Sequence, residues 1–149
     1  MSETLAAADH FLADVLRKRG QRVTTQRLLL HRALREFDRH LSAEHLLAAV
    51  ADRVPGLSLP TVYATLELFE HLGLVRRVPV PGGPTLYDPR PDAHHHLACR
   101  RCGTVEDIDT EVDIEKALRD ARRRGWLSVD ATVVVSGLCA ACARAETVS

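Results

Sequence analysis

Apolar residues recur at the helical period of three to four positions in four segments of the first half of the chain. Ser42 and Ser58 precede two of these segments as N-caps, and Thr24 or Thr25 can cap another. Gly73 follows the last segment, at a position typical of a helix end. The first half is therefore predicted to form four helices. They cover residues 5–19, 25–37, 42–50 and 58–72.

The pattern changes after residue 73. Residues 74–80 and 85–87 have the composition of strands, and a Pro-Gly-Gly-Pro turn separates them. Helices followed by a two-stranded hairpin outline a winged helix-turn-helix, in which the last helix enters the DNA major groove and the hairpin flanks the phosphate backbone. A helical domain with an ordinary surface hairpin fits the same pattern, so the DNA-binding interpretation needs further support.

The second half mixes strands with one helix. Strands are predicted at 94–99, 104–108 and 126–135, with a helix at 112–124. Residues 131–135 are apolar and largely β-branched, which favours a buried strand or a dimer seam. The predicted fold class is α+β. It comprises a winged-helix DNA-binding domain at 1–87 and a small α/β dimerisation and metal-binding domain at 88–149, with a hinge at about 88–93.

Composition and charge narrow the class of protein. Apolar residues make up 46% of the 149 residues, whereas aromatic residues make up only 4%, so a metal would help to stabilise the core. Basic and acidic side chains number 20 each, which weakens a nucleic-acid interpretation, yet residues 1–80 carry 11 basic against 9 acidic. No apolar run approaches the roughly 18 residues of a membrane span, and no signal peptide is evident. We therefore expect a cytoplasmic protein that does not enter a membrane.

The only four cysteines form two matched pairs, Cys99-x-x-Cys102 and Cys139-x-x-Cys142. Each pair can present two thiolates to one metal, and two pairs complete the closed tetrahedral site of a structural zinc ion, Zn(2+). Two disulfides are an alternative that requires an oxidising compartment. A redox-active dithiol is another, but it requires a thiolate near the start of a helix, whereas these pairs are predicted to flank strands.

A second group of ligand residues surrounds the first cysteine pair. His94 and His96 share one face of a predicted strand, because side chains alternate along a strand. Asp88 lies in the predicted hinge, Asp107 in the following strand, and His40 in the first half. Nitrogen and carboxylate oxygen together suit divalent first-row ions. A solvated run of histidines is the simpler alternative, but a metal held by both domains and the hinge would fix one domain against the other.

Several motifs in this order resemble the Fur family of metal-dependent bacterial repressors. The resemblance extends from about residue 17 to residue 142 and implies a homodimer that binds a palindromic operator in double-stranded DNA when its hinge site holds metal. The motifs are Arg22-x-Thr24-x-Gln26-Arg27, Ser58-x-x-Thr61-Val62-Tyr63-x-x-Leu66, His94-x-His96-Leu97-x-Cys99-x-x-Cys102-Gly103 and Gly137-x-Cys139-x-x-Cys142.

The resemblance also assigns residues. By position, the family's regulatory metal site matches five residues, and its winged helix suggests the DNA contacts. The regulatory ligands are His40, Asp88, His94, His96 and Asp107. The expected DNA-binding residues are Thr61 and Tyr63 in the major groove, on the helix that Ser58 caps, and Arg17, Arg19, Arg76 and Arg77 at phosphates.

The two carboxylates of the predicted regulatory site, Asp88 and Asp107, indicate which branch of the family the chain resembles. Both are Asp here, which is similar to the peroxide-sensing PerR branch, whereas the iron-uptake branch usually has Glu. In PerR-like proteins, Fe(2+) reacts with hydrogen peroxide and a ligand histidine is oxidised, at positions that match His40 and His94. The regulatory ion is therefore expected to be Fe(2+) or Mn(2+). Ala93 and Ala131 stand where many relatives have ligands of an additional metal site, so that site is expected to be missing.

Other functions fit the sequence less well. An iron-, manganese- or zinc-responsive uptake repressor is the alternative within the family. A zinc enzyme of the nucleobase-deaminase type would need a His-x-Glu signature and a Pro-Cys-x-x-Cys motif. The histidine run lacks that Glu, and Leu138 precedes Cys139. We therefore expect a regulator rather than an enzyme.

Overall fold

The computed structural model describes residues 2–37, 40–90 and 92–147. The chain divides into two compact units, the first formed by residues 1–78 and 84–91 and the second by residues 79–83 and 92–149. Residue 91 of the predicted hinge lies outside the described residues. The assignment of DNA binding to 1–87 and of dimerisation to 88–149 stays a prediction.

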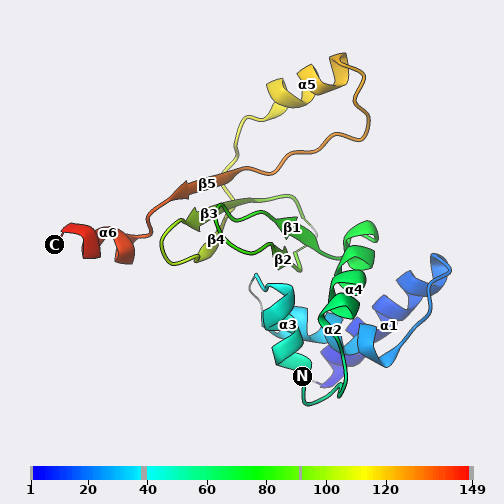
Figure 1. Ribbon diagram of the computed structural model, residues 1–149. Helices are drawn as coiled ribbons and strands as arrows, with labels where there is room; N and C mark the ends of the chain where they lie inside the picture. The colour runs from blue at the N-terminus through cyan, green and yellow to red at the C-terminus, as the bar shows by residue number, and fades with distance from the viewer. Residues whose placement is uncertain (1, 38–39, 91, 148–149) are drawn as a thin grey trace. The chain divides into compact units, whose positions relative to one another are not determined.

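The first unit contains the four predicted helices (Figure 1). They are α1 (Ser2–Lys18), α2 (Thr25–Glu36), α3 (Ala43–Val50) and α4 (Leu59–His71). The side chains of Thr24, Ser42 and Ser58 each accept a hydrogen bond from the backbone N–H three residues later, so the predicted N-caps are confirmed.

A two-stranded hairpin completes this unit. Strands β1 (Arg76–Val78) and β2 (Leu86–Asp88) pair antiparallel; β1 is shorter than the predicted 74–80, and β2 has the predicted length but is shifted by one residue. Leu41, before α3, forms an isolated antiparallel bridge with Tyr87 of β2, and each residue's backbone N–H donates to the other's carbonyl. Asp88, predicted in the hinge, is instead the last residue of β2. The bridge thus ties the hairpin to the helices.

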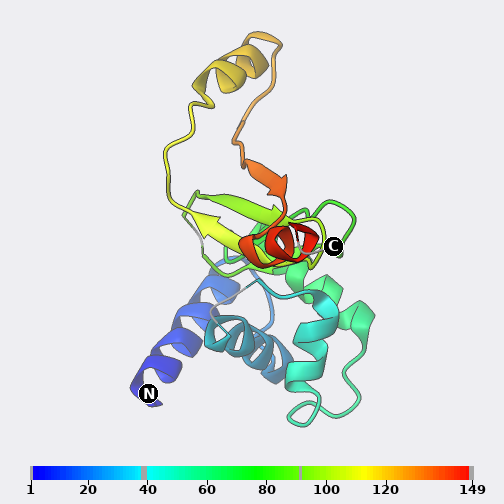
Figure 2. The ribbon, with the colours of Figure 1, turned by 90° about the vertical axis from the view of Figure 1, so that its left-hand side faces the viewer.

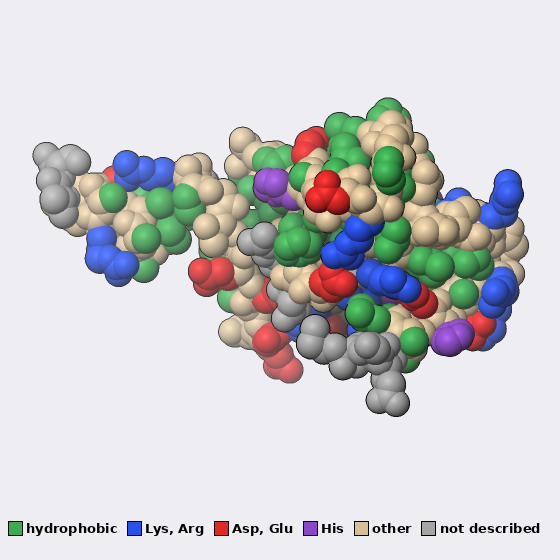
Figure 3. Space-filling view, turned by 90° about the horizontal axis from the view of Figure 1, so that it is seen from below, with side chains coloured by type: hydrophobic (Ala, Val, Ile, Leu, Met, Phe, Trp, Pro, Cys, Tyr) green, Lys and Arg blue, Asp and Glu red, His purple; other side chains and the backbone are tan. Residues whose placement is uncertain are grey.

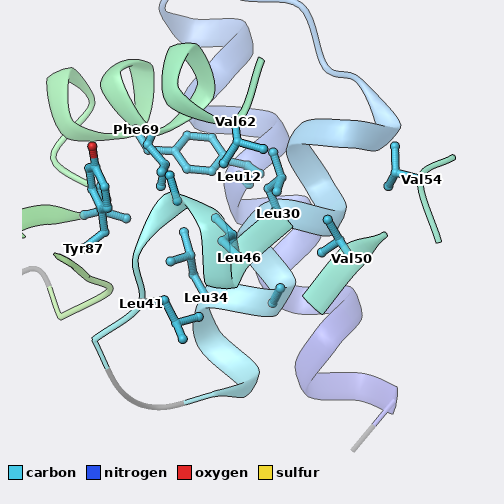
Figure 4. Close-up of a cluster of buried hydrophobic side chains, with 14 of the residues drawn as sticks. Leu12, Leu30, Leu34, Leu41, Leu46, Val50, Val54, Val62, Phe69 and Tyr87 are labelled. Atoms are coloured by element: carbon cyan, nitrogen blue, oxygen red, sulfur yellow. The ribbon is translucent and has the colours of Figure 1, made fainter. Parts of the chain in front are cut away.

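The core of the first unit draws on all four helices and the hairpin (Figure 4). Leucines dominate it, and Phe69 of α4 is its largest fully buried side chain. Tyr87 is 3% exposed and brings β2 into the same cluster. Other members are Leu12, Leu16, Leu30, Leu34, Leu41, Leu46, Val50, Val62 and Leu66.

The second unit is built on a three-stranded sheet with the order β4-β3-β5 (Figure 2). Strand β3 (His95–Cys99) pairs antiparallel with β4 (Val105–Ile108) and parallel with β5 (Val134–Gly137). Helix α5 (Glu115–Arg123) lies between β4 and β5 in the sequence, and α6 (Ala140–Thr147) follows β5. The α+β class predicted from the sequence is confirmed.

In the second unit, the bounds of the last predicted strand were wrong, and one helix was not predicted. The last strand covers residues 134–137 and not 126–135, because pairing with β3 begins at Val134 opposite His96. Ser128 has a φ of 52°, which interrupts an extended conformation. The second cysteine pair follows β5, as expected, but it also lies at the start of a helix that was not predicted, because α6 begins directly after Cys139 in an alanine-rich segment of high helix propensity. None of the described helices is long and apolar enough to cross a membrane.

His31 is a buried histidine in the core of the first unit. Its side chain meets the Phe69 ring edge to face, with centroids 5.8 Å apart, and the residue is 4% exposed. Its Nδ1 has no hydrogen-bond partner among the described residues. Desolvation, helped by the charge of Arg35 and opposed by that of Asp9, lowers the pKa of His31 to about 4. The imidazole is therefore neutral in the folded protein at neutral pH.

This histidine predicts an acid-sensitive core. An unfolded histidine titrates near pH 6.5, so the unfolded state binds more protons than the folded state between about pH 6.5 and 4. Stability should fall as the pH drops through that window, by about 2 kcal/mol between pH 7 and 4.5. The free energy of unfolding, measured with urea, should therefore fall by about 2 kcal/mol less in His31→Leu than in the wild type between pH 7 and 4.5. His10→Gln, at an exposed histidine, is the control, and equal losses in all three proteins would contradict the prediction.

Candidate metal centres and nucleic-acid interface

The sheet of the second unit brings the two cysteine pairs together. Cys99 ends β3 and Cys102 lies in the turn to β4, where Gly103 has a φ of 75°. The other pair follows β5, which is the parallel neighbour of β3, so both pairs lie at one end of the sheet. The four sulfur atoms all lie within 4.8 Å of one another. All four predicted ligands are therefore assembled.

The geometry fits a tetrahedral ion. The sulfur atoms of Cys102 and Cys139 are 3.8 Å apart. Four thiolates about 2.3 Å from a zinc ion form a tetrahedron with edges of roughly 3.8 Å. All four cysteines are free thiols, which disfavours the disulfide alternative.

The pKa values of the cysteine thiols are shifted by their hydrogen bonds. The backbone N–H of Cys139, 3.4 Å from the Cys99 sulfur, is the largest of several hydrogen bonds that lower the pKa of Cys99 to about 6. Hydrogen bonding with Thr104 lowers the pKa of Cys102. By contrast, hydrogen bonding with Cys139 raises the pKa of Cys142 to about 12. Four thiolates this close repel one another, so full ionisation requires a bound cation.

In the first unit, the Leu41–Tyr87 bridge places His40 beside Asp88, because these residues flank the bridged pair on either strand. The His40 Nε2 and Asp88 Oδ2 atoms are 3.2 Å apart, and the two side chains are 8% and 3% exposed. The other oxygen of Asp88 accepts a hydrogen bond of 2.8 Å from the backbone N–H of Arg90. This second interaction orients the carboxylate toward the imidazole.

In the second unit, three further predicted ligands converge. His96 lies opposite Asp107 in the β3–β4 pairing. The Asp107 Oδ1 atom is 3.3 Å from His94 Nε2 and 3.6 Å from His96 Nε2. The other ring nitrogen of His94 lies 2.9 Å from the carbonyl of Asp92. Donation to that carbonyl leaves the Nε2 lone pair available for a metal, the usual arrangement of a ligating histidine.

His95 behaves differently, as strand alternation predicts. Its Nδ1 accepts a hydrogen bond of 3.1 Å from the backbone N–H of Val133. The ring therefore holds the segment that leads into β5. The middle histidine of the run has a structural role, and its neighbours on either side have side chains that face Asp107.

The expected major-groove residues lie at the start of α4. Ser58 Oγ accepts a hydrogen bond from the backbone N–H of Thr61, and the two hydroxyl oxygens are 2.9 Å apart. Tyr63 is 42% exposed, so its ring is accessible. Its hydroxyl donates a hydrogen bond of 2.9 Å to the Glu44 carboxylate on α3. The sequence does not predict this role of Glu44, for which the only local signal is its position just after the N-cap of α3.

Two of the four arginines expected at phosphates, Arg17 and Arg77, already have acidic neighbours. Arg77 lies 2.8 Å from a Glu70 carboxylate oxygen and over the Tyr87 ring at 5.9 Å. Arg17 is 3.7 Å from Asp14, in a pair exposed enough to contribute little. On the face in Figure 3, basic side chains likewise lie beside acidic ones. Any phosphate would have to compete with these carboxylates.

A helical unit with a hairpin, joined to a small α/β unit with a cluster of four cysteines, defines the class of metal-responsive DNA-binding regulators. The model of the ferric uptake regulator family matches residues 18–136, which is most of the chain. The protein belongs to this family, as its sequence motifs indicated. It is a metal-responsive transcriptional regulator and not an enzyme.

Individual relatives agree with this assignment. The transcriptional regulator FurA of Mycobacterium tuberculosis is 33% identical over 136 residues, which cover 91% of this chain and 92% of that protein. The peroxide-responsive repressor PerR of Staphylococcus epidermidis is 31% identical over 111 residues, 72% of this chain and 74% of that one. A zinc uptake regulator solved with zinc and DNA has a TM-score of 0.69 and 29% identity, over 98% of this chain and 97% of that chain.

The cysteine cluster predicts one tightly held metal ion per chain. Cys142→Ser leaves three thiolates and an open position that water and a chelator can enter. After dialysis against a chelator, the wild type should retain about one ion and the variant almost none, as measured by plasma mass spectrometry. Ser136→Ala, an exposed substitution on β5, is the matched control. Retention of the ion by Cys142→Ser would show that the cluster is not the binding site.

Proposed function

We propose that this regulator is a metal-dependent repressor in which one ion joins the two ligand sets. His40 and Asp88 offer one nitrogen and one oxygen, 3.2 Å apart. His94, His96 and Asp107 offer two nitrogens and one oxygen. Neither set alone provides the four to six ligands that first-row divalent ions usually take, whereas five donors together do. This incompleteness of each set is the observation that carries the proposal.

The cysteine cluster would have a separate, permanent role. Four thiolates close the coordination sphere of Zn(2+) and leave no position for a substrate or a signal. Zinc binding there would stabilise the end of the sheet where β3 and β5 meet. The closed set of sulfurs and the open set of nitrogen and oxygen donors would select different ions, with Fe(2+) or Mn(2+) at the second.

The partners we propose are double-stranded DNA and a second copy of the chain. None of the residues of α5 is buried, and Trp126 and Leu127 just after it are 67% and 89% exposed. A second copy could cover these two exposed apolar side chains, Trp126 and Leu127. A homodimer presents two copies of α4 related by two-fold symmetry, which suits a palindromic operator. Thr61 and Tyr63 would read bases there.

We further infer that the regulatory site senses peroxide. Both carboxylates are Asp, and a PerR is among the relatives. Five ligands leave one position of an octahedral ion accessible to a small molecule. Bound Fe(2+) would supply one electron to hydrogen peroxide and so activate it, and the remaining oxidation, which inserts one oxygen atom, would fall on a ligand histidine, the nearest oxidisable side chain. Oxidation of His40 or His94 would remove a metal-binding nitrogen. The ion would then bind the two ligand sets less tightly, and the protein would dissociate from DNA.

A second candidate is a repressor that responds to iron, manganese or zinc alone. It uses the same ligands, and the name of the matching family, ferric uptake regulator, favours it. The two candidates differ in whether metal-loaded protein keeps its DNA after exposure to peroxide. They make the same prediction for removal of a ligand.

If one ion uses both ligand sets, loss of either set should have the same effect. His40→Ala and Asp107→Ala should each abolish binding of the single Mn(2+) and weaken metal-dependent DNA binding by about 100-fold or more, since the metal no longer favours the DNA-binding state. Calorimetry and fluorescence anisotropy measure the two effects. Asp109→Ala, at an exposed neighbour of Asp107, is the control. Two ions in the wild type, with only one lost in each variant, would separate the sets into independent sites.

Peroxide sensing predicts a specific covalent change. Protein loaded with Fe(2+) and treated with one equivalent of hydrogen peroxide should gain one oxygen atom on His40 or His94, detected by tandem mass spectrometry, and should lose DNA affinity. Protein loaded with Mn(2+) should do neither, because Mn(2+) reduces peroxide poorly under these conditions. Unmodified histidines and unchanged DNA binding in the iron-loaded protein would leave the second candidate.

A further inference from the structure

The contact between Tyr63 and Glu44 fixes the position of a proton. The phenol oxygen and the Glu44 Oε1 atom are 2.9 Å apart, a normal distance for a hydrogen bond between oxygens. The residues are 19 positions apart and lie on different helices, α4 and α3. Hydrogen bonds from its own backbone N–H and from Tyr63 lower the pKa of Glu44. The carboxylate is therefore ionised at neutral pH and can only accept, so the phenol must donate.

This assignment limits what the phenol can offer to another molecule. A phenol has one proton, and once that proton is donated the oxygen has only lone pairs left. The same hydrogen bond raises the pKa of Tyr63, so the phenol remains protonated at neutral pH. Toward a ligand on its exposed side, Tyr63 is therefore a hydrogen-bond acceptor. Without Glu44, the hydroxyl could rotate and act as donor or acceptor.

Few other side chains near Tyr63 can hydrogen-bond to a ligand, so the acceptor character of its phenol oxygen matters. The other exposed residues in the first three turns of α4 are Pro60 and Ala64, whose side chains offer no hydrogen bonds, and Glu67. At the start of the helix, Ser58 and Thr61 engage each other. The phenol is thus the main neutral polar group that this face presents.

In the major groove, the base edges differ in what they offer. The amino groups N6 of adenine and N4 of cytosine are the donors, whereas guanine O6 and N7 and thymine O4 are acceptors. An acceptor-only phenol can pair with the first group and is repelled by the second. We propose that Glu44 sets the base preference of this regulator by holding the Tyr63 hydroxyl proton, so that the phenol oxygen accepts a hydrogen bond from an amino group of adenine or cytosine.

This inference rests on the proposed function, because it requires α4 to enter the major groove. It makes Glu44 a specificity-determining residue that acts through Tyr63 and needs no contact with DNA. Tyr63→Phe is the matched control, since it removes the hydroxyl and keeps the ring. Glu44→Ala removes the acceptor altogether.

The test begins with a randomised double-stranded DNA library and Mn(2+)-loaded full-length protein. The wild type should select sequences with adenine or cytosine at one position of each half-site. Glu44→Ala should accept guanine or thymine there, and Tyr63→Phe should show no preference at that position. Replacing the base's amino group by hydrogen in the selected sequence should weaken wild-type binding about tenfold and leave Tyr63→Phe unaffected.

The outcomes separate the two claims. If wild-type protein selects no sequence at all, the proposed function fails. If it selects a sequence but Glu44→Ala keeps the same base preference, DNA binding stands and the role of Glu44 is rejected. If Tyr63→Phe keeps the preference, the phenol oxygen does not read that base, which also overturns the inference. Circular dichroism of each variant establishes that α3 and α4 are intact.

Discussion

Strand β3 carries predicted metal ligands at both ends, and hydrogen bonds to β4 and β5 hold it from both sides. The antiparallel pairing sets His96 opposite Asp107, and the parallel pairing sets Cys99 opposite Gly137, just before the second cysteine pair. A slip of one residue in either pairing would turn ligand side chains to the wrong face. Both ligand clusters of the second unit therefore depend on the register of one five-residue strand.

In the first unit, strand pairing also positions two predicted ligands, but with far less sheet. A single bridge between Leu41 and Tyr87 positions His40 and Asp88, and both bridge residues are buried in the core that also holds Phe69 of α4. The predicted ligand pair and α4, the helix expected to read DNA, are thus packed on one core. Packed cores switch between discrete arrangements rather than deform continuously. Under the proposed function, metal binding at the pair would select one arrangement of this unit.

Acidic side chains accompany the residues expected to contact DNA. Glu70 pairs with Arg77, Glu44 with Tyr63, and the chain as a whole is neutral. Sequence-independent affinity for DNA comes mainly from basic side chains at phosphates. Carboxylates at these positions reduce that component and make binding depend more on base contacts and on the dimer. A regulator that must leave its operator when its metal site changes benefits from weak non-specific binding.

The sequence alone determined what short windows of residues encode. Serine and threonine caps defined three helices, the spacing of the cysteines indicated a four-sulfur cluster, and strand alternation separated His95 from its neighbours. Only the tertiary structure decided that β5 begins at Val134, that Asp88 ends β2, and that Glu44 holds Tyr63. The physical reason is distance along the chain. Capping and alternation depend on residues a few positions apart, whereas strand register and contacts between helices are set by packing among segments that no local pattern relates.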